Sequence, residues 1–171
     1  MNKRAKISSF EQHNHSHCID NALHEARQLC QKKAVKLTPL REQVLTFVWQ
    51  NHKPLGAYAL LEMLAEANNN GKRRVAPPTV YRALYFLQEC GLVHRIASLN
   101  AYMGCCRPSQ SHQSHFFICR QCSATAELTS TAISQTINQA AKQTGFSAET
   151  ECVEVVGLLP AMPKLTATSP Q

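Results

Sequence analysis

The stretch that starts at Pro77 most narrowly limits what this chain can fold into. Pro77 and Pro78 stand where a helix begins, since proline is favoured in the first turn and lacks the amide hydrogen that later turns require. Gly91 stands where that helix ends, at a position that glycine commonly takes. Between them an apolar stripe recurs at helical spacing and consists of Val80, Leu84 and Leu87. Two short apolar runs, at residues 92–97 and 101–105, follow and predict a hairpin closed by residues 98–100.

Three further segments with helical apolar spacing precede this helix. They cover residues 20–33, with Asp20 as the expected N-cap, residues 38–52, which open on Thr38 and Pro39, and residues 56–66. Helices followed by a hairpin are typical of a winged-helix domain, in which the last helix enters the major groove of DNA. The exposed face of that helix presents Tyr81, Arg82, Tyr85 and Gln88. Arginine can bridge two guanine acceptors, although a plain solvated face could have the same composition.

Basic charge is concentrated in the same part of the chain. Residues 1–108 hold 15 Lys or Arg against 7 Asp or Glu, whereas residues 109–171 hold 3 against 4. Basic surfaces bind polyanions because each phosphate contact releases condensed counterions. Ordinary solubility charge is the alternative. Together with the order of the helices, the bias favours double-stranded DNA as the partner.

The rest of the chain predicts a small α/β unit. Strands at 115–120 and 124–128 flank a Cys-x-x-Cys motif, and a helix at 129–144 and a strand at 147–159 follow. A unit of this size needs a metal or a partner to be stable. The predicted class is therefore α+β, with a flexible arm at 1–18, an N-terminal winged helix-turn-helix domain at 19–106 and a linker at 107–114. A small α/β dimerisation domain that binds metal at 115–159 and a flexible tail at 160–171 complete the expected organisation.

Eight cysteines and eight histidines indicate metal chemistry. We expect a cytoplasmic protein that does not enter membranes, because no apolar run approaches the roughly 18 residues of a membrane span and no secretory signal is visible. Disulfides are rare in the cytoplasm, so metal binding or redox chemistry is the expected use of the cysteines. Cys119 and Cys122 have the spacing of half a tetrahedral zinc site, which still needs two ligands. A thioredoxin-like pair would require a helix at the motif. A second group either binds metal or is incidental: His13, His15, His17 and Cys18.

Four stretches resemble one family of regulators. They are Leu37–Arg41 (LTPLR), Pro77–Leu84 (PPTVYRAL), Gly91–His94 (GLVH) and Cys119–Cys122 (CRQC). The chain resembles the ferric uptake regulator family, and within it most resembles the zinc uptake regulator branch. The similarity extends over about residues 22–157. The helix motif followed by Val-His and by the Cys-x-x-Cys pair makes this resemblance specific.

The resemblance implies a homodimeric repressor that binds operator DNA with Zn²⁺ as corepressor and controls zinc uptake genes. Cys105, and a short run of histidines before the Cys-x-x-Cys motif, favour zinc over iron. The implied regulatory zinc ligands are His94, Cys105, His112 and Glu127, which sequence spacing alone would not bring together. Mixed nitrogen, sulfur and oxygen donors suit Zn²⁺. The implied DNA contacts are Tyr58, Thr79, Tyr81 and Arg82.

One departure from the family pattern concerns the end of the chain. Family members usually complete a structural four-cysteine zinc site with a second Cys-x-x-Cys motif, at a spacing that falls on Leu159 and Met162 in this sequence. Neither residue type is a good zinc ligand. Cys119 and Cys122 are therefore expected to form only a partial structural site, either lost and filled by apolar side chains or completed by other residues. The candidates are Cys106, His115 and Cys152.

Three other functions fit parts of the sequence. An iron- or peroxide-responsive regulator of the same family is the nearest, and Cys105 argues against it. A zinc storage or delivery protein leaves the helix order and the basic bias unexplained. A zinc hydrolase needs an open coordination position beside a general base, and no His-Glu-x-x-His or comparable pairing is present. We therefore expect no enzymatic activity.

Overall fold

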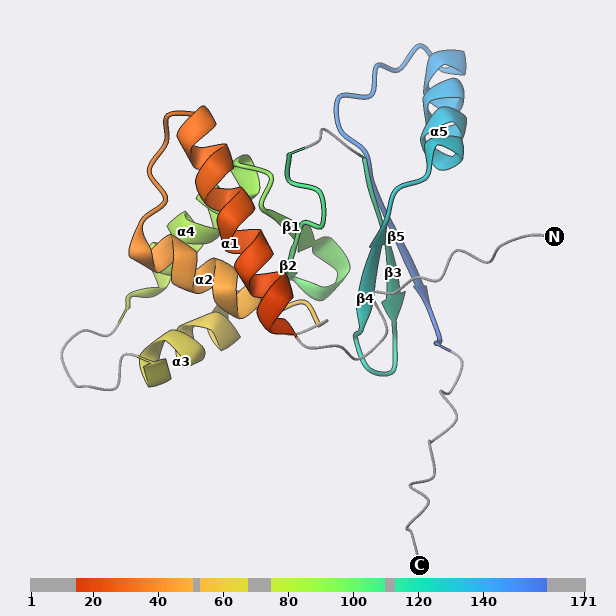
Figure 1. The fold of residues 1–171 in the computed structure, drawn as a ribbon. Helices are drawn as coiled ribbons and strands as arrows, with labels where there is room; N and C mark the ends of the chain where they lie inside the picture. Colours follow the sequence, from red (N-terminus) through yellow and green to blue (C-terminus); the bar gives the residue numbers. More distant parts are fainter. Residues whose placement is uncertain (1–14, 51–52, 68–74, 110–112, 160–171) are drawn as a thin grey trace, which may run out of the picture.

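The computed structural model describes residues 15–50, 53–67, 75–109 and 113–159 (Figure 1). Its helices are α1 (His15–Lys32), α2 (Pro39–Trp49), α3 (Ala57–Ala67), α4 (Pro77–Glu89) and α5 (Thr131–Gln143). Its strands are β1 (Val93–Ile96), β2 (Ala101–Gly104), β3 (Ser114–Cys119), β4 (Thr125–Leu128) and β5 (Cys152–Gly157), with a 3₁₀ turn η2 (Ala97–Leu99) between β1 and β2. The α+β prediction is confirmed. Within these residues no helix has the length and apolar character needed to cross a membrane.

Helices α1–α4 form one lobe, and the β1–β2 hairpin lies between this lobe and the β3–β5 sheet (Figure 1). The signals that begin and end these helices act as the sequence suggests. The Thr38 hydroxyl caps α2 by accepting the Arg41 N–H, and Gly91 follows α4 with a φ of +76°. The apolar stripes of the helices meet in one core, which includes Val44, Leu45, Val48, Leu60, Leu64, Val80, Leu84 and Leu87.

Helix α1 begins earlier than the sequence suggests. It starts at His15, so Asp20 lies inside the helix and the expected N-cap is wrong. The buried residues Ala22, Ala26 and Cys30 recur every fourth residue, and the half-buried Cys18 extends this stripe by one turn. The partial burial of Cys18 at one end of this stripe explains why the polar residues 15–18 are helical. Residues 15–18, which were expected to belong to a flexible arm, are thus part of α1, and His13 lies outside the described residues.

The hairpin is fastened to the helical lobe at both of its ends. Strands β1 and β2 are antiparallel, with Val93 opposite Gly104 and Ile96 opposite Ala101. Tyr102 exchanges two backbone hydrogen bonds of 2.8 Å with Leu55, which precedes α3. Gly104 lies against the Trp49 ring so closely that a Cβ there would be 2.2 Å from the ring carbon Cε2. This geometry places the hairpin as the wing of the helical lobe.

The second lobe is a three-stranded sheet in the order β4-β3-β5 with α5 beside it. Strand β3 is antiparallel to β4 and parallel to β5, so that Ser114 lies opposite Cys152 and Cys119 lies opposite Gly157. The Ser130 hydroxyl caps α5 by accepting the Ile133 N–H. Strand β5 is shorter than the expected strand at 147–159, because residues 147–151 have no strand structure.

Two kinds of contact join the wing to this sheet. The first is a buried cluster of Ile96, Phe116 and Ile118. The partly buried side chains of Leu99 and Met103 pack against this cluster. In addition, the Glu154 carboxylate on β5 accepts hydrogen bonds from the Ala97 N–H at 2.7 Å and the Ser98 N–H at 3.0 Å. These two N–H groups belong to the first turn of η2, where backbone donors have no helical partner. The wing and the sheet are therefore held in one defined arrangement.

Candidate metal centre

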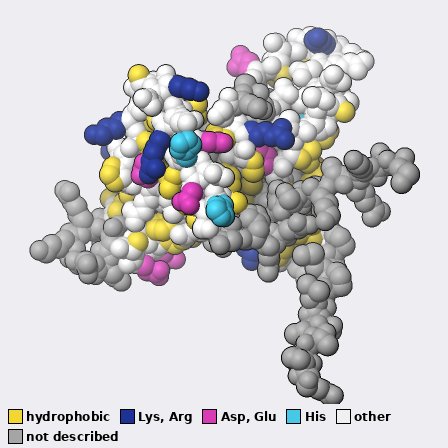
Figure 2. Space-filling model, viewed as in Figure 1, with side chains coloured by type: hydrophobic (Ala, Val, Ile, Leu, Met, Phe, Trp, Pro, Cys, Tyr) yellow, Lys and Arg dark blue, Asp and Glu magenta, His cyan; other side chains and the backbone are white. Residues whose placement is uncertain are grey.

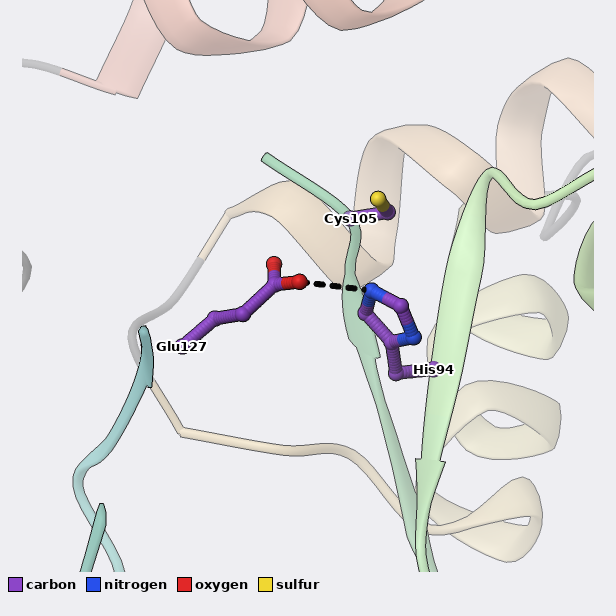
Figure 3. A group of neighbouring side chains, drawn as sticks. All are labelled: His94, Cys105 and Glu127. Atoms are coloured by element: carbon purple, nitrogen blue, oxygen red, sulfur yellow. Dashed lines mark ion pairs between the residues drawn. The ribbon is translucent and has the colours of Figure 1, made fainter. Parts of the chain in front are cut away.

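Three of the four residues expected to bind regulatory zinc lie together where the wing meets the sheet (Figure 3). His94, Cys105 and Glu127 each offer one ligand atom, and these three atoms all lie within 4.8 Å of one another. His94 Nε2 and Glu127 Oε1 are 3.0 Å apart. The fourth expected ligand, His112, lies outside the described residues.

Strand register and local packing position each ligand. His94 lies on β1, where its ring contacts Phe116 of β3 edge to face at a centroid distance of 5.4 Å. Glu127 lies on β4 directly opposite Phe116, so both side chains are anchored around the same aromatic ring. Cys105 follows β2, and its N–H donates to the Leu92 carbonyl at 3.0 Å. The centre therefore depends on contact between the two lobes.

Neighbouring polar groups hold the ligand atoms. The Cys106 N–H donates to Glu127 Oε2 at 3.1 Å, and the Arg107 N–H donates to Cys105 Sγ at 3.3 Å. The buried Ser114 hydroxyl lies 3.4 Å from both Glu127 Oε1 and His94 Nδ1. Ser114 was not expected from the sequence. A serine at the start of a strand gives no signal of this role until the register places it between two ligands.

The surroundings of Cys105 decide the protonation of its thiol when no metal is bound. Burial raises the pKa of the Cys105 thiol to about 12, and the nearby Glu127 carboxylate adds to this effect. The thiol is therefore protonated at neutral pH, and an ion that binds Cys105 must displace the proton. In a tetrahedral site, zinc bonds of about 2.0–2.3 Å place two ligand atoms about 3.3–3.8 Å apart. Ligand atoms that all lie within 4.8 Å of one another fit a zinc ion after side-chain movements of about 1 Å.

The residues expected to contact DNA lie on the exposed face of the helical lobe. Tyr81 and Arg82 are exposed on α4, and Thr79 is half-buried in its first turn. Tyr58 on α3 is 72% exposed although it is a large aromatic residue. In the view of Figure 2, Lys and Arg side chains lie mostly over the helices. Exposed tyrosine and arginine side chains suit contacts with phosphates and base edges.

The Cys119 and Cys122 pair lies in the turn between β3 and β4, away from the first centre. Cys119 Sγ accepts hydrogen bonds from the backbone N–H groups of Leu159, Cys122 and Gln121, and these lower the pKa of its thiol to about 7. Cys122 is exposed. Backbone N–H donors in this turn therefore favour the thiolate form of Cys119.

None of the three candidate residues completes this pair. Cys152 lies opposite Ser114, at the far end of the sheet from Cys119. His115 is buried, and its Nε2 is 2.7 Å from the Glu151 carboxylate. The Cys106 N–H donates to Glu127 of the first centre. Within the described residues, the only group of three or more potential ligands is His94, Cys105 and Glu127.

The fold and the site together define a class of protein. A winged-helix domain that exposes tyrosine and arginine side chains is joined to a small α/β unit. The candidate metal ligands His94, Cys105 and Glu127 lie between the two. The model of the ferric uptake regulator family matches residues 32–156. The chain belongs to the ferric uptake regulator family.

Several of the similar proteins are zinc uptake regulators. The zinc uptake regulation protein of Escherichia coli (strain K12) is 36% identical over 146 residues, which are 85% of this chain and 83% of that protein. A solved zinc uptake regulator complexed with zinc and DNA is 36% identical, with a TM-score of 0.76 over 84% of this chain and 93% of that chain. This match confirms the predicted winged-helix and dimerisation-domain architecture.

A further zinc uptake regulator, XcZur, has been solved in two states. Its holo structure is 35% identical to this chain, with a TM-score of 0.72 over 82% of this chain and 95% of that chain. Its apo structure has a TM-score of only 0.50 over the same shares. Because the two XcZur structures have nearly the same identity to this chain, the difference lies in arrangement and not in sequence.

Proposed function

We propose that this protein is a zinc-responsive transcriptional repressor that binds operator DNA as a homodimer with Zn²⁺ as corepressor and controls zinc uptake genes. The observation that carries the proposal is the position of His94, Cys105 and Glu127 between the wing and the sheet. The zinc uptake regulator complexed with zinc and DNA, which has the same fold, supports it.

Zinc acts here as a clamp between the two lobes. His94 and Cys105 belong to the wing, and Glu127 belongs to the sheet. An ion that binds all three is bound well only when the lobes are in contact. A ligand shifts a conformational equilibrium by the difference between its affinities for the two states. Zinc therefore favours the arrangement in which the recognition helix α4 has one fixed orientation.

The comparison with XcZur supports this clamp. The chain matches the holo structure at a TM-score of 0.72 and the apo structure at 0.50. The overall arrangement of this chain is thus closer to that of holo XcZur than to that of apo XcZur. The thiol of Cys105 supports zinc in preference to a hard cation, because thiolates select soft and borderline metals.

The homodimer is supported by the surface of the second lobe. Strand β5 is at the edge of the sheet, and Val155, Val156 and Leu158 are 45%, 55% and 58% exposed. An exposed apolar edge strand is a surface that another chain can cover. A dimer also places two recognition helices at the major-groove spacing of about 34 Å, or a multiple of it, which palindromic operators require.

Replacing Cys105 with serine tests the proposal. The Cys105→Ser variant should lose zinc-dependent operator binding, measured by fluorescence anisotropy with a palindromic duplex from upstream of zinc uptake genes. The Cys122→Ser variant removes an exposed thiol from the turn between β3 and β4, away from this centre, and should behave like the wild type. If Cys105→Ser responds to zinc normally, the proposed regulatory centre is wrong.

A further inference from the structure

The turn between β3 and β4 holds two thiols in a defined geometry. The Ser123 N–H donates to the Cys119 carbonyl at 2.8 Å, and Ser123 has a φ of +57°, which closes the turn tightly. The Cys119 N–H donates to the Ala124 carbonyl at 2.9 Å, so Cys119 and Cys122 lie within one tight turn of the chain. The pair is therefore already arranged for a reaction that joins them.

The described residues do not fit a structural zinc ion at this pair. A structural zinc is almost always bound by four protein ligands. Cys152 is five residues along β5 from Gly157, the partner of Cys119, which corresponds to roughly 16 Å at the rise of a strand. Leu159, at the position of a family cysteine, supplies only its backbone N–H to Cys119.

An apolar hollow adjoins Cys119, one of the two thiols. A hollow of about 270 Å³ beside Cys119 is lined by Phe117, Ile118, Val155, Gly157, Leu158 and Leu159. Among the residues that the structure describes, no carboxylate, imidazole or further thiol lines it. The Arg120 N–H donates to the Gly157 carbonyl at 2.9 Å, and this hydrogen bond and the apolar packing join the end of β5 to the turn, which is the task that a metal would otherwise perform.

We propose that Cys119 and Cys122 are a redox-active dithiol that closes reversibly to a disulfide when a hydroperoxide oxidises it. The exposed sulfur of Cys122 attacks the peroxide, so that an S–O bond forms, the O–O bond breaks and water leaves with the Cys122 proton. The Cys119 thiolate then attacks the resulting sulfenic acid. The S–S bond forms, the S–O bond breaks, and hydroxide leaves and takes a proton from solvent. The dithiol loses two electrons, and hydrogen peroxide is reduced to two molecules of water.

Peptide mapping of the full-length protein tests this proposal. The protein is loaded with one equivalent of zinc, treated with hydrogen peroxide and blocked with N-ethylmaleimide. Trypsin cuts after Arg120, so that Cys119 and Cys122 fall on separate peptides, 96–120 and 121–142. We expect one peroxide-dependent linked pair, assigned to Cys119 and Cys122 by fragmentation. Dithiothreitol should separate the peptides and restore two alkylatable thiols.

Variants separate this reaction from other thiol chemistry. Cys122→Ser should abolish the linked pair while the folded circular dichroism spectrum is retained, because Cys122 is exposed. Cys106→Ser is the matched control, because Cys106 is on the same tryptic peptide as Cys119 and could be mistaken for it. This variant should still form the disulfide between Cys119 and Cys122. A linkage of Cys122 to Cys105 or Cys106, or no linkage in excess peroxide, would overturn the proposal. So would a second bound zinc per protomer that Cys122→Ser loses.

Discussion

Replacing Glu154 with alanine should weaken the response to zinc although Glu154 does not bind the ion. Its carboxylate accepts two N–H groups of η2 at 2.7 and 3.0 Å and so links β5 to the wing. Hydrogen bonds to charged groups are worth about 1.5–3 kcal/mol each. Both are solvent-exposed and water can replace the carboxylate, so we expect a total loss of only about 1–2 kcal/mol.

This loss acts on the arrangement that zinc requires. If the Glu154 contact exists only when wing and sheet touch, about 1–2 kcal/mol corresponds to roughly a 5- to 30-fold higher zinc concentration for half-maximal operator binding. Fluorescence anisotropy against buffered free zinc measures this shift. Glu149→Ala removes the same charge from an exposed residue and should change little. An unchanged zinc response in Glu154→Ala would refute the idea that this contact stabilises the zinc-competent arrangement.

Three further predictions concern DNA contact, pH and packing. Arg82→Ala should cost roughly 1–3 kcal/mol of specific operator binding. Arg120→Ala, in the exposed β3–β4 turn, should leave operator affinity unchanged. If both variants bind the operator equally well in an electrophoretic shift assay, Arg82 does not contact DNA. Zinc affinity, measured by chelator competition, should rise about tenfold per pH unit near neutrality for each proton displaced, because Cys105 has its pKa raised to about 12 and stays protonated below that pH; a flat profile would contradict a Cys105 ligand. Gly104→Ala should lower the free energy of unfolding by about 1–3 kcal/mol in denaturant unfolding, because the added Cβ would lie 2.2 Å from Trp49 Cε2. Gly157→Ala is the control, since a Cβ there meets nothing within 4 Å. Equal stabilities of the two variants would show that the Trp49 ring moves aside freely.

Local sequence signals were sufficient for the helical lobe. Proline at the start of α4, Gly91 after it and an apolar stripe between them act within one helix, so spacing alone predicts them. The start of α1 was missed because its first turn is polar. The signal was present, since Cys18 continues the stripe of Ala22 and Ala26 by one turn.

The metal centre could not be built from spacing. His94 and Glu127 are separated by 33 positions and meet only because Ile96, Phe116 and Ile118 pack the wing against the sheet. Glu154 and Ser114 were missed for the same reason, because each acts across the contact between lobes. The resemblance to a family supplied the ligands that physical reasoning from the sequence left dispersed.

The most direct test of the zinc-responsive repressor is operator binding by the wild-type protein as free zinc is varied, with bound zinc measured on the same samples. We expect weak operator binding without zinc and tight binding once about one zinc per protomer is bound. A duplex of scrambled sequence should show no such transition. Operator binding that is indifferent to zinc, or that follows Fe²⁺ instead, would show that zinc is not the corepressor.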